Sequence, residues 1–209
     1  MKENKNKIIL TSIIILLPMA VGLILWNRLP AEVAIHFDWN NQPDGWGSKS
    51  MLVFGVPLLM LALHLLTIFL VTQDPKKQNI GDKMRNLIFW IIPVISSGML
   101  ICLYLSALGK NVDLLRVVSL SVGLLFLVIG NYMTKNHQNY TVGVVLPWTL
   151  ENKENWNKTH RLAAKVFIGA GLLIALNAFW GNTIVFVMVI LLTAIIPCVY
   201  SYGIYKKGD

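Results

Sequence analysis

Six apolar segments, separated by polar stretches, divide this chain of 209 residues. The segments are Ile8–Trp26, Met51–Thr72, Leu87–Leu108, Leu114–Met133, Leu162–Trp180 and Thr183–Tyr205. Each is about as long as a helix that crosses a bilayer, which needs roughly 17–25 residues. The first follows three lysines, as a secretory signal would, but it is longer than the usual signal core of about 7–15 residues and lacks a small-x-small cleavage site. The pattern predicts an all-α integral membrane protein with six transmembrane helices in one membrane domain, residues 1–209.

Short connections and internal prolines refine this prediction. Residues 110–113 and 181–182 leave little room between segments, so segments three and four, and segments five and six, are predicted to form antiparallel hairpins. A proline inside a membrane helix, such as Pro18, is tolerated where a neighbouring helix supplies a donor to the carbonyl that the proline leaves free. Four prolines lie within or near the segments and are tolerable on this condition: Pro18, Pro57, Pro93 and Pro197.

The polar stretch between the first two segments, residues 27–50, has the features of a small structured loop. Apolar and more polar residues alternate over 33–37, which is typical of a short strand. Residues 40–45 are dense in turn-forming types, and Gly45 is expected to supply a positive φ. The stretch therefore predicts a strand followed by a tight turn.

Several side chains of this loop are candidates for ligand contact. The two tryptophans suit a membrane–water interface, where an apolar ring carries a polar N–H. The acids and the histidine are metal-ligand types, but His-x-Asp has no spacing rule behind it, so no metal site is expected. These groups either hold the turn together by hydrogen bonds or contact a ligand directly. The ligand-contact hypothesis comprises His36, Asp38, Trp39, Asp44, Trp46, Ser48 and Lys49.

The longest polar stretch, residues 135–161, leads into the fifth apolar segment. Gly143 and Pro147 restrict the backbone on the way in. Asn152 is expected to cap a helix N-terminus, with Thr149 as the alternative. Apolar and aromatic residues at spacings of three and four form one stripe of that helix, which runs on into the apolar segment. The stripe consists of Trp156, His160, Ala163 and Phe167.

This second stretch is expected either to anchor the membrane surface or to bind a partner protein. Trp148 and Trp156 suit both roles. His160 beside Arg161 is expected to be a structural hydrogen-bond donor rather than a base. The partner-binding hypothesis comprises Asn139, Gly143, Pro147, Trp148, Thr149, Trp156, His160 and Arg161.

Composition and charge agree with a membrane protein of defined orientation. Apolar residues make up 56% of the chain and charged residues 13%, against about a quarter in soluble domains. Fourteen of the eighteen lysines and arginines fall on the side that holds the N-terminus. The positive-inside rule therefore places both termini and the 135–161 loop in the cytoplasm and the 27–50 loop outside. The net charge of +8 is a topology signal, and direct nucleic-acid binding is not expected.

The sequence lacks the motifs of membrane enzymes. G-x-S-x-G, H-E-x-x-H, a Walker loop and a dinucleotide fingerprint are all missing, so neither catalysis nor a cofactor is expected. Proton relays and transporters place acids and bases within membrane segments. Here His64 is the one ionisable group well inside a segment, and a packing role is expected for it. Cys102 and Cys198 lie in apolar segments and are expected to be buried thiols rather than a disulfide.

Two sets of residues resemble known bacterial membrane families. One set resembles the signature of a membrane domain of unknown function: Leu29-Pro30, Ile35-His36, Asp44-Gly45 and Gly47-Ser48-Lys49. The other resembles the cytoplasmic signature of the SdpI-type immunity proteins: Asn139, Gly143, Pro147-Trp148-Thr149-Leu150, Trp156 and Thr159-His160-Arg161. Val145-Leu146 stand where that family often has Arg-Thr, so a cation available to an acidic partner is missing.

The resemblance implies a role that the residues alone do not give. Such proteins protect a bacterium from its own secreted killing peptide, the sporulation-delay toxin, and in the best-known case also hold a small autorepressor at the membrane. The expectation is a multi-pass protein of the bacterial cell membrane that binds a peptide toxin outside and a cytosolic repressor inside. The alternatives are a small-molecule transporter or channel and a purely regulatory membrane anchor for a transcription factor.

Overall fold

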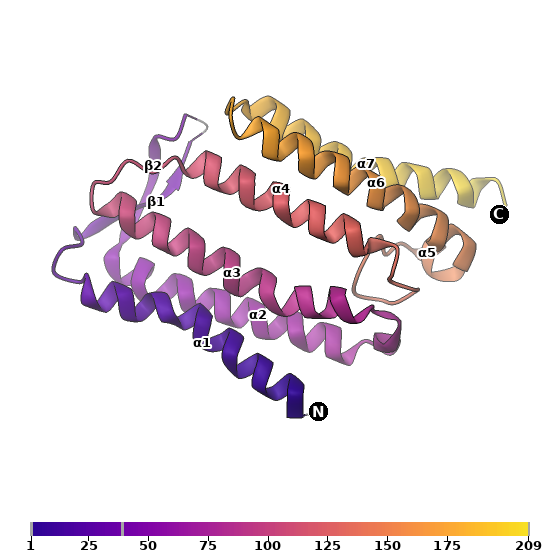
Figure 1. The fold of residues 1–209 in the computed structure, drawn as a ribbon, viewed down its shortest axis with the longest axis horizontal. Coiled ribbons are helices and arrows are strands. Elements are labelled where there is room, and N and C mark those ends of the chain that lie inside the picture. The colour runs from indigo at the N-terminus through magenta and orange to yellow at the C-terminus, as the bar shows by residue number, and fades with distance from the viewer. Residues whose placement is uncertain (1, 39, 209) are drawn as a thin grey trace. The chain divides into compact units, whose positions relative to one another are not determined.

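The computed structural model describes residues 2–38 and 40–208 and consists mainly of long helices (Figure 1). A π-helical turn, Met51–Gly55, precedes α2, and a 3-10 turn, Lys77–Asn79, follows it. The remaining elements are α1 (Lys2–Ile24), β1 (Glu32–Phe37), β2 (Pro43–Ser48), α2 (Val56–Gln73), α3 (Asp82–Ala107), α4 (Leu114–Met133), α5 (Pro147–Glu151), α6 (Lys153–Asn177) and α7 (Thr183–Lys206).

The six predicted membrane spans are confirmed. Among the described residues six helices are long and apolar enough to cross a membrane. The fourth span has the predicted bounds, whereas α3 and α6 begin well before their apolar segments. Both helices start with a polar turn, since helix formation needs backbone hydrogen bonds and a cap rather than apolar side chains alone. Asn152 supplies that cap for α6, as predicted: its Oδ1 accepts from the N–H groups of Glu154 and Asn155 at 2.8 and 2.9 Å.

The chain forms two compact units. The first comprises Met1–Ile68 and Leu87–Leu115, and the second comprises Phe69–Asn86 and Arg116–Asp209. Helices α2, α3 and α4 each contribute to both units, so the two share long helices rather than being joined by a linker.

In the first unit, α1 packs on α3 through hydrogen bonds in an apolar setting. Pro18 interrupts α1 and has no N–H to donate to Ile14 O. Ser97 Oγ of α3 donates to that carbonyl at 2.9 Å, which is the donor expected from a neighbouring helix. Tyr104 Oη donates to Pro18 O at 3.0 Å. The adjoining core consists of Leu29, Val33, Leu52, Val53, Leu100 and Tyr104.

His64 also lies in the first unit, fully buried in α2. Its Nε2 is 2.8 Å from Thr11 Oγ1 of α1. This contact joins the two helices, in agreement with the expected packing role.

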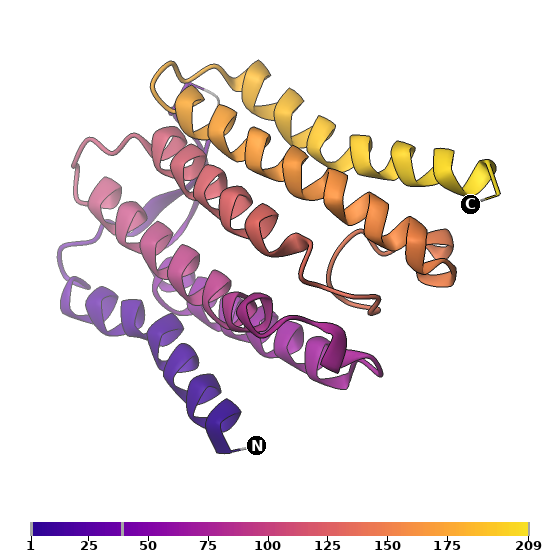
Figure 2. The same cartoon turned by 45° about the vertical axis from the view of Figure 1, so that its right-hand side comes forward.

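In the second unit, glycines let α4 and α6 approach closely. A Cβ built on Gly171 of α6 would lie 2.7 Å from the backbone O of Gly123 in α4, closer than real side chains come. A Cβ built on Gly130 of α4 would likewise lie 2.9 Å from the backbone O of Ala164 in α6. Small residues at a helix crossing let backbones touch in a membrane, where the packing itself stabilises the pair. Helix α7 lies alongside α6, antiparallel to it, as the short connection predicted (Figure 2).

The two cysteines are free, but the expectation that both are buried was wrong. Cys102 is half-buried in α3, whereas Cys198 is exposed on α7. A position inside an apolar segment does not imply burial within the protein, because the lipid-facing side of a membrane helix is equally apolar.

Candidate functional site

The loop between α1 and α2 folds into an antiparallel β-hairpin. Strand β1 matches the predicted strand, and β2 pairs with it in a register that sets Val33 opposite Gly47 and Ala34 opposite Trp46, with irregularities next to His36. The expectation for Gly45 was wrong: the residue with positive φ is Asn41, at 59°, and Gly45 lies in β2. Glycine is needed there for another reason, because a Cβ would lie 2.7 Å from the Cβ of His36.

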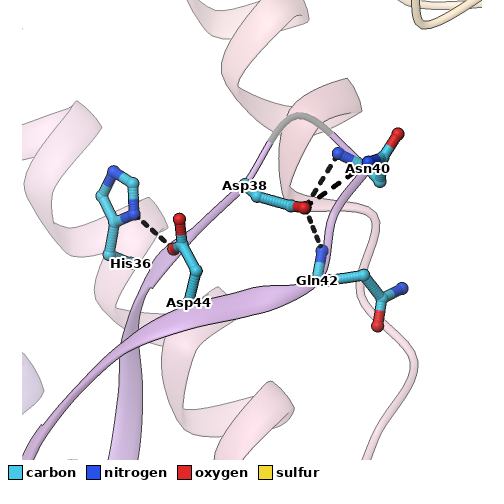
Figure 3. A network of polar contacts seen from close by, with 5 residues as sticks. All are labelled: His36, Asp38, Asn40, Gln42 and Asp44. Atoms are coloured by element: carbon cyan, nitrogen blue, oxygen red, sulfur yellow. Dashed lines mark hydrogen bonds and ion pairs between the residues drawn. The ribbon is translucent and has the colours of Figure 1, made fainter.

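Asp38 holds the hairpin turn. Its Oδ1 accepts from the backbone N–H groups of Asn40 and Gln42, each at 2.8 Å, and its own N–H donates to Gln42 O (Figure 3). The Gln42 N–H bond chiefly, with the Asn40 bonds, lowers the pKa of Asp38, because these donors stabilise the ionised form. Asp38 was expected either to hold the turn or to contact a ligand, and the structure shows the turn-holding hydrogen bonds.

His36 and Asp44 face each other across the two strands (Figure 3). His36 Nδ1 lies 2.5 Å from Asp44 Oδ1, and both side chains remain substantially exposed. Asp38 is engaged in the turn, and no group of three His, Cys, Asp or Glu side chains among residues 2–38 and 40–208 is placed to hold a metal ion.

A second contact fixes the hairpin to the connection between α3 and α4. Asn41 Nδ2 donates to Val112 O and its Oδ1 accepts from Leu114 N–H, both at 3.0 Å. Asn41 was not among the predicted site residues, because its partners lie some seventy positions further along the chain. The turn is therefore held at a defined position in the first unit.

The remaining predicted residues of this loop divide into held and free side chains. Lys49 Nζ donates to Trp26 O at 3.2 Å and lies over the Trp26 ring, so it caps the end of α1. Ser48 Oγ accepts from the N–H of Met51 where the next helical turn begins. Among the described residues of the hairpin, Trp46 is a large apolar side chain presented outward, at 60% exposed. Trp39 lies outside the described residues.

The predicted residues from Asn139 to Thr149 belong to a network that we call the loop platform, made of residues 74–81 and 134–152, and the other three lie in the adjoining α6. Asp74 joins its two segments: Asp74 Oδ2 accepts from Tyr140 N–H at 2.8 Å and from Thr141 Oγ1 at 2.7 Å. Asn79 donates to Gln138 O, and Gly81 N–H donates to Asn136 Oδ1. Sequence reasoning missed these links, because the side chains that make them look like ordinary loop residues.

Asn139 and Thr149 shape the platform from inside, and both are fully buried. Asn139 Nδ2 donates to the carbonyls of His137 and Val142, while its Oδ1 accepts from two backbone N–H groups. Thr149 Oγ1 accepts from Leu146 N–H. These two residues therefore act on the fold of the loop rather than on a partner's surface.

His160 connects α6 to the platform. Its Nδ1 donates to Trp156 O at 2.8 Å, and its Nε2 accepts from Val144 N–H at 3.1 Å, which defines the neutral tautomer protonated on Nδ1. Trp156 stacks on the imidazole ring, and its Nε1 donates to Asn136 O. Gly143 has φ of 125°, and a Cβ on it would overlap His160 Nε2. Within the predicted stripe Trp156, His160 and Ala163 are buried and Phe167 is partly buried, and the structural role of His160 is confirmed.

Trp148 ties α5 to α7. Its Nε1 donates to Ser201 Oγ at 3.0 Å, and its ring stacks on Tyr205 and meets Tyr202 edge-on. Of the eight residues in the partner-binding hypothesis, Pro147, Gly143 and Arg161 are exposed and Trp148 is half-buried. The other four lie in the interior and hold the backbone that carries these exposed residues.

Comparison with known proteins identifies the family. Residues 135–201 match the SdpI/YfhL protein family, and residues 13–61 match a domain of unknown function, DUF1648, so both predicted resemblances are confirmed. The chain is 33% identical over 217 residues to "Immunity protein SdpI" of Bacillus subtilis (strain 168), across 99% of this chain and 98% of that protein. No solved structure matches it. This is not a family of enzymes. With six membrane-crossing helices and a relative matched along its full length, the chain belongs to the SdpI family of immunity proteins and is a multi-pass protein of the bacterial cell membrane.

Proposed function

We propose that this protein protects the bacterium that carries it against a secreted antimicrobial peptide of the sporulation-delay type, and that it does so by binding. The observation that carries the proposal is the similarity to an immunity protein along essentially the whole chain. The hydrogen-bonded hairpin supports binding rather than chemistry, because its polar groups mostly make structural contacts, as Asp38 does with Gln42 and Lys49 does with Trp26.

The hairpin is the proposed contact surface for the peptide, on the outer side that the positive-inside rule assigns to it. Asp38 and Asn41 fix the turn before any ligand arrives. Trp46 offers a large exposed ring, and tryptophans at the centre of an interface often contribute 2 kcal/mol or more. Because the turn is already ordered, little conformational entropy is lost when a ligand binds to the exposed Trp46 ring. This favours affinity for an amphipathic peptide.

The loop platform is the proposed cytoplasmic docking surface for a repressor. Its exposed member Pro147 and its half-buried member Trp148 provide apolar contacts, and the exposed Arg161 of the adjoining α6 provides a cation. Arg161 supplies a positive charge on this face, where Val145-Leu146 lack one. The buried residues Trp156 and His160 maintain this surface indirectly.

Survival of a toxin-sensitive bacterium that expresses this chain, challenged with purified sporulation-delay peptide, tests the proposal. Wild type should protect, and Trp46→Ala should shift the protected dose by roughly thirtyfold. Trp180→Ala is the matched control, since Trp180 is 76% exposed on the connection between α6 and α7. Lack of protection by inserted wild type refutes peptide immunity, and an equal loss in both tryptophan variants refutes the hairpin as the contact surface.

The repressor arm has its own test. Arg161→Gln should reduce co-purification of a DNA-binding protein after toxin exposure while leaving survival unchanged. Capture that does not depend on Arg161 would contradict the assignment of this surface.

A further inference from the structure

Two lysine ammonium groups converge on one tyrosine ring where α3 begins and α4 ends. Lys83, in the first turn of α3, places its Nζ 5.9 Å from the centre of the Tyr132 ring. Lys135, just beyond α4, places its Nζ 5.5 Å from the same ring. Elsewhere in the platform, Lys76 lies singly over a different ring, that of Tyr140, at 5.2 Å.

Backbone packing brings together the two chain segments that carry these lysines. Gly81 N–H, two residues before Lys83, donates to Asn136 Oδ1 at 3.0 Å. A Cβ on Gly81 would lie 3.1 Å from Lys135 O, so the two chain segments are in direct contact. The shared position at Tyr132 therefore follows from the platform's fold and not only from two flexible side chains.

These two positive charges lack a counter-ion. Within residues 2–38 and 40–208, neither Lys83 nor Lys135 forms an ion pair with a carboxylate, and the neighbouring Asp82 pairs with Arg85 at 3.5 Å. Asp74 is buried, and its oxygens accept from the platform's own donors. Each ammonium carries three N–H donors, and a ring covers only one side of it. An anion beside the Tyr132 ring would accept from the remaining donors and neutralise the local positive charge.

We propose that Lys83 and Lys135, positioned by the Tyr132 ring, bind the phosphate of an anionic phospholipid headgroup. The site lies at the ends of two membrane spans, Asp82–Ala107 and Leu114–Met133, and therefore at headgroup depth. A lipid phosphate is present at that depth throughout the leaflet, whereas a soluble anion must be drawn from dilute solution. Basic residues on the cytoplasmic side attract anionic lipids, and this is the side predicted for the platform.

Native mass spectrometry of the full chain in detergent, titrated with phosphatidylglycerol, tests the site. Wild type should retain phosphatidylglycerol better than phosphatidylcholine. The double variant Lys83→Gln/Lys135→Gln should weaken that retention by at least about tenfold. Lys76→Gln removes one charge from the same platform, at the Tyr140 ring that only this lysine contacts among the described residues. It should weaken retention of phosphatidylglycerol by less than about threefold. Thermal unfolding of each variant establishes that the fold is unchanged.

Three outcomes would overturn the proposal. Equal retention of the two lipids would show that charge is not recognised. A loss in Lys76→Gln as large as in the double variant would show general surface attraction and no site. Displacement of the lipid by glycerol phosphate at the same concentration would show that the ligand is a soluble phosphate.

Discussion

Replacing Gly143 by alanine tests whether the contact between the platform and α6 stabilises the second unit. At φ of 125° a residue with a Cβ is strained, at a cost of about 1–3 kcal/mol. The new methyl would also overlap His160 Nε2, so the ring must move and lose its bonds to Val144 N–H and Trp156 O. Two such bonds contribute about 0.5–1.5 kcal/mol each. We therefore expect Gly143→Ala to lower the free energy of unfolding by roughly 2–6 kcal/mol.

Unfolding in mixed micelles by increasing SDS, followed by far-UV circular dichroism, measures this loss. Gly169→Ala is the matched control: Gly169 lies in α6 of the same unit with nothing within 4 Å of an added Cβ, and its φ is not positive. Alanine in a helix interior should stabilise it by roughly 0.5–1 kcal/mol relative to glycine.

A double-mutant cycle separates the two causes. With His160 replaced by alanine, the Gly143→Ala change should retain only its backbone cost, so the two substitutions should be non-additive by about 1–3 kcal/mol. If Gly143→Ala is as stable as Gly169→Ala, or if the two changes are additive, the contact between Gly143 and His160 does not hold the platform.

Three further predictions concern helix packing and the hairpin. Gly171→Leu should cost about 1–3 kcal/mol or more because its side chain meets backbone of α4, while Gly169→Leu should leave the unfolding transition in detergent nearly unchanged. Ser97→Ala should cost about 1 kcal/mol in wild type but much less beside Pro18→Ala, where the helix itself can satisfy Ile14 O; equal costs would contradict that assignment. Since the folded pKa of Asp38 is lowered, its support of the turn should persist below the ordinary carboxyl pKa of about 3.9 and fade as pH falls through the folded value. The NMR chemical shift of the Gln42 amide proton reports this hydrogen bond. If that shift already changes to its unbonded value at the ordinary carboxyl pKa, the reasoning is refuted.

The sequence predicts the spans well because their signal is local. Twenty apolar residues in succession leave few alternatives to a membrane helix, and Asn152 at the head of α6 is an equally local signal. Strand β2 carried no such signal: Pro43–Ser48 holds a proline and two glycines, types that strands disfavour. It pairs because β1 lies beside it, which is a tertiary effect.

The candidate sites were predictable as regions but not as arrangements. The residues resembling the family signature in 139–161 include several that prove to be interior, such as Asn139 and Trp156, and a sequence does not separate a side chain that contacts a partner from one that shapes the surface around it. Asp74 and Asn41 escaped notice because their partners are distant in sequence. Hydrogen bonds between remote loops leave no periodic pattern.

Asn41 makes the hairpin turn and the start of α4 a single mechanical element. Its side-chain amide donates to one backbone group and accepts from another, which is the pattern of bonds between neighbouring strands. Aspartate at this position would lose the donor and leucine would lose both bonds. A displacement of the hairpin turn must therefore either break two hydrogen bonds or carry the first residue of α4 with it. A movement of the turn is thus transmitted to the membrane-spanning helix α4 through these hydrogen bonds, without a conformational change in the strands.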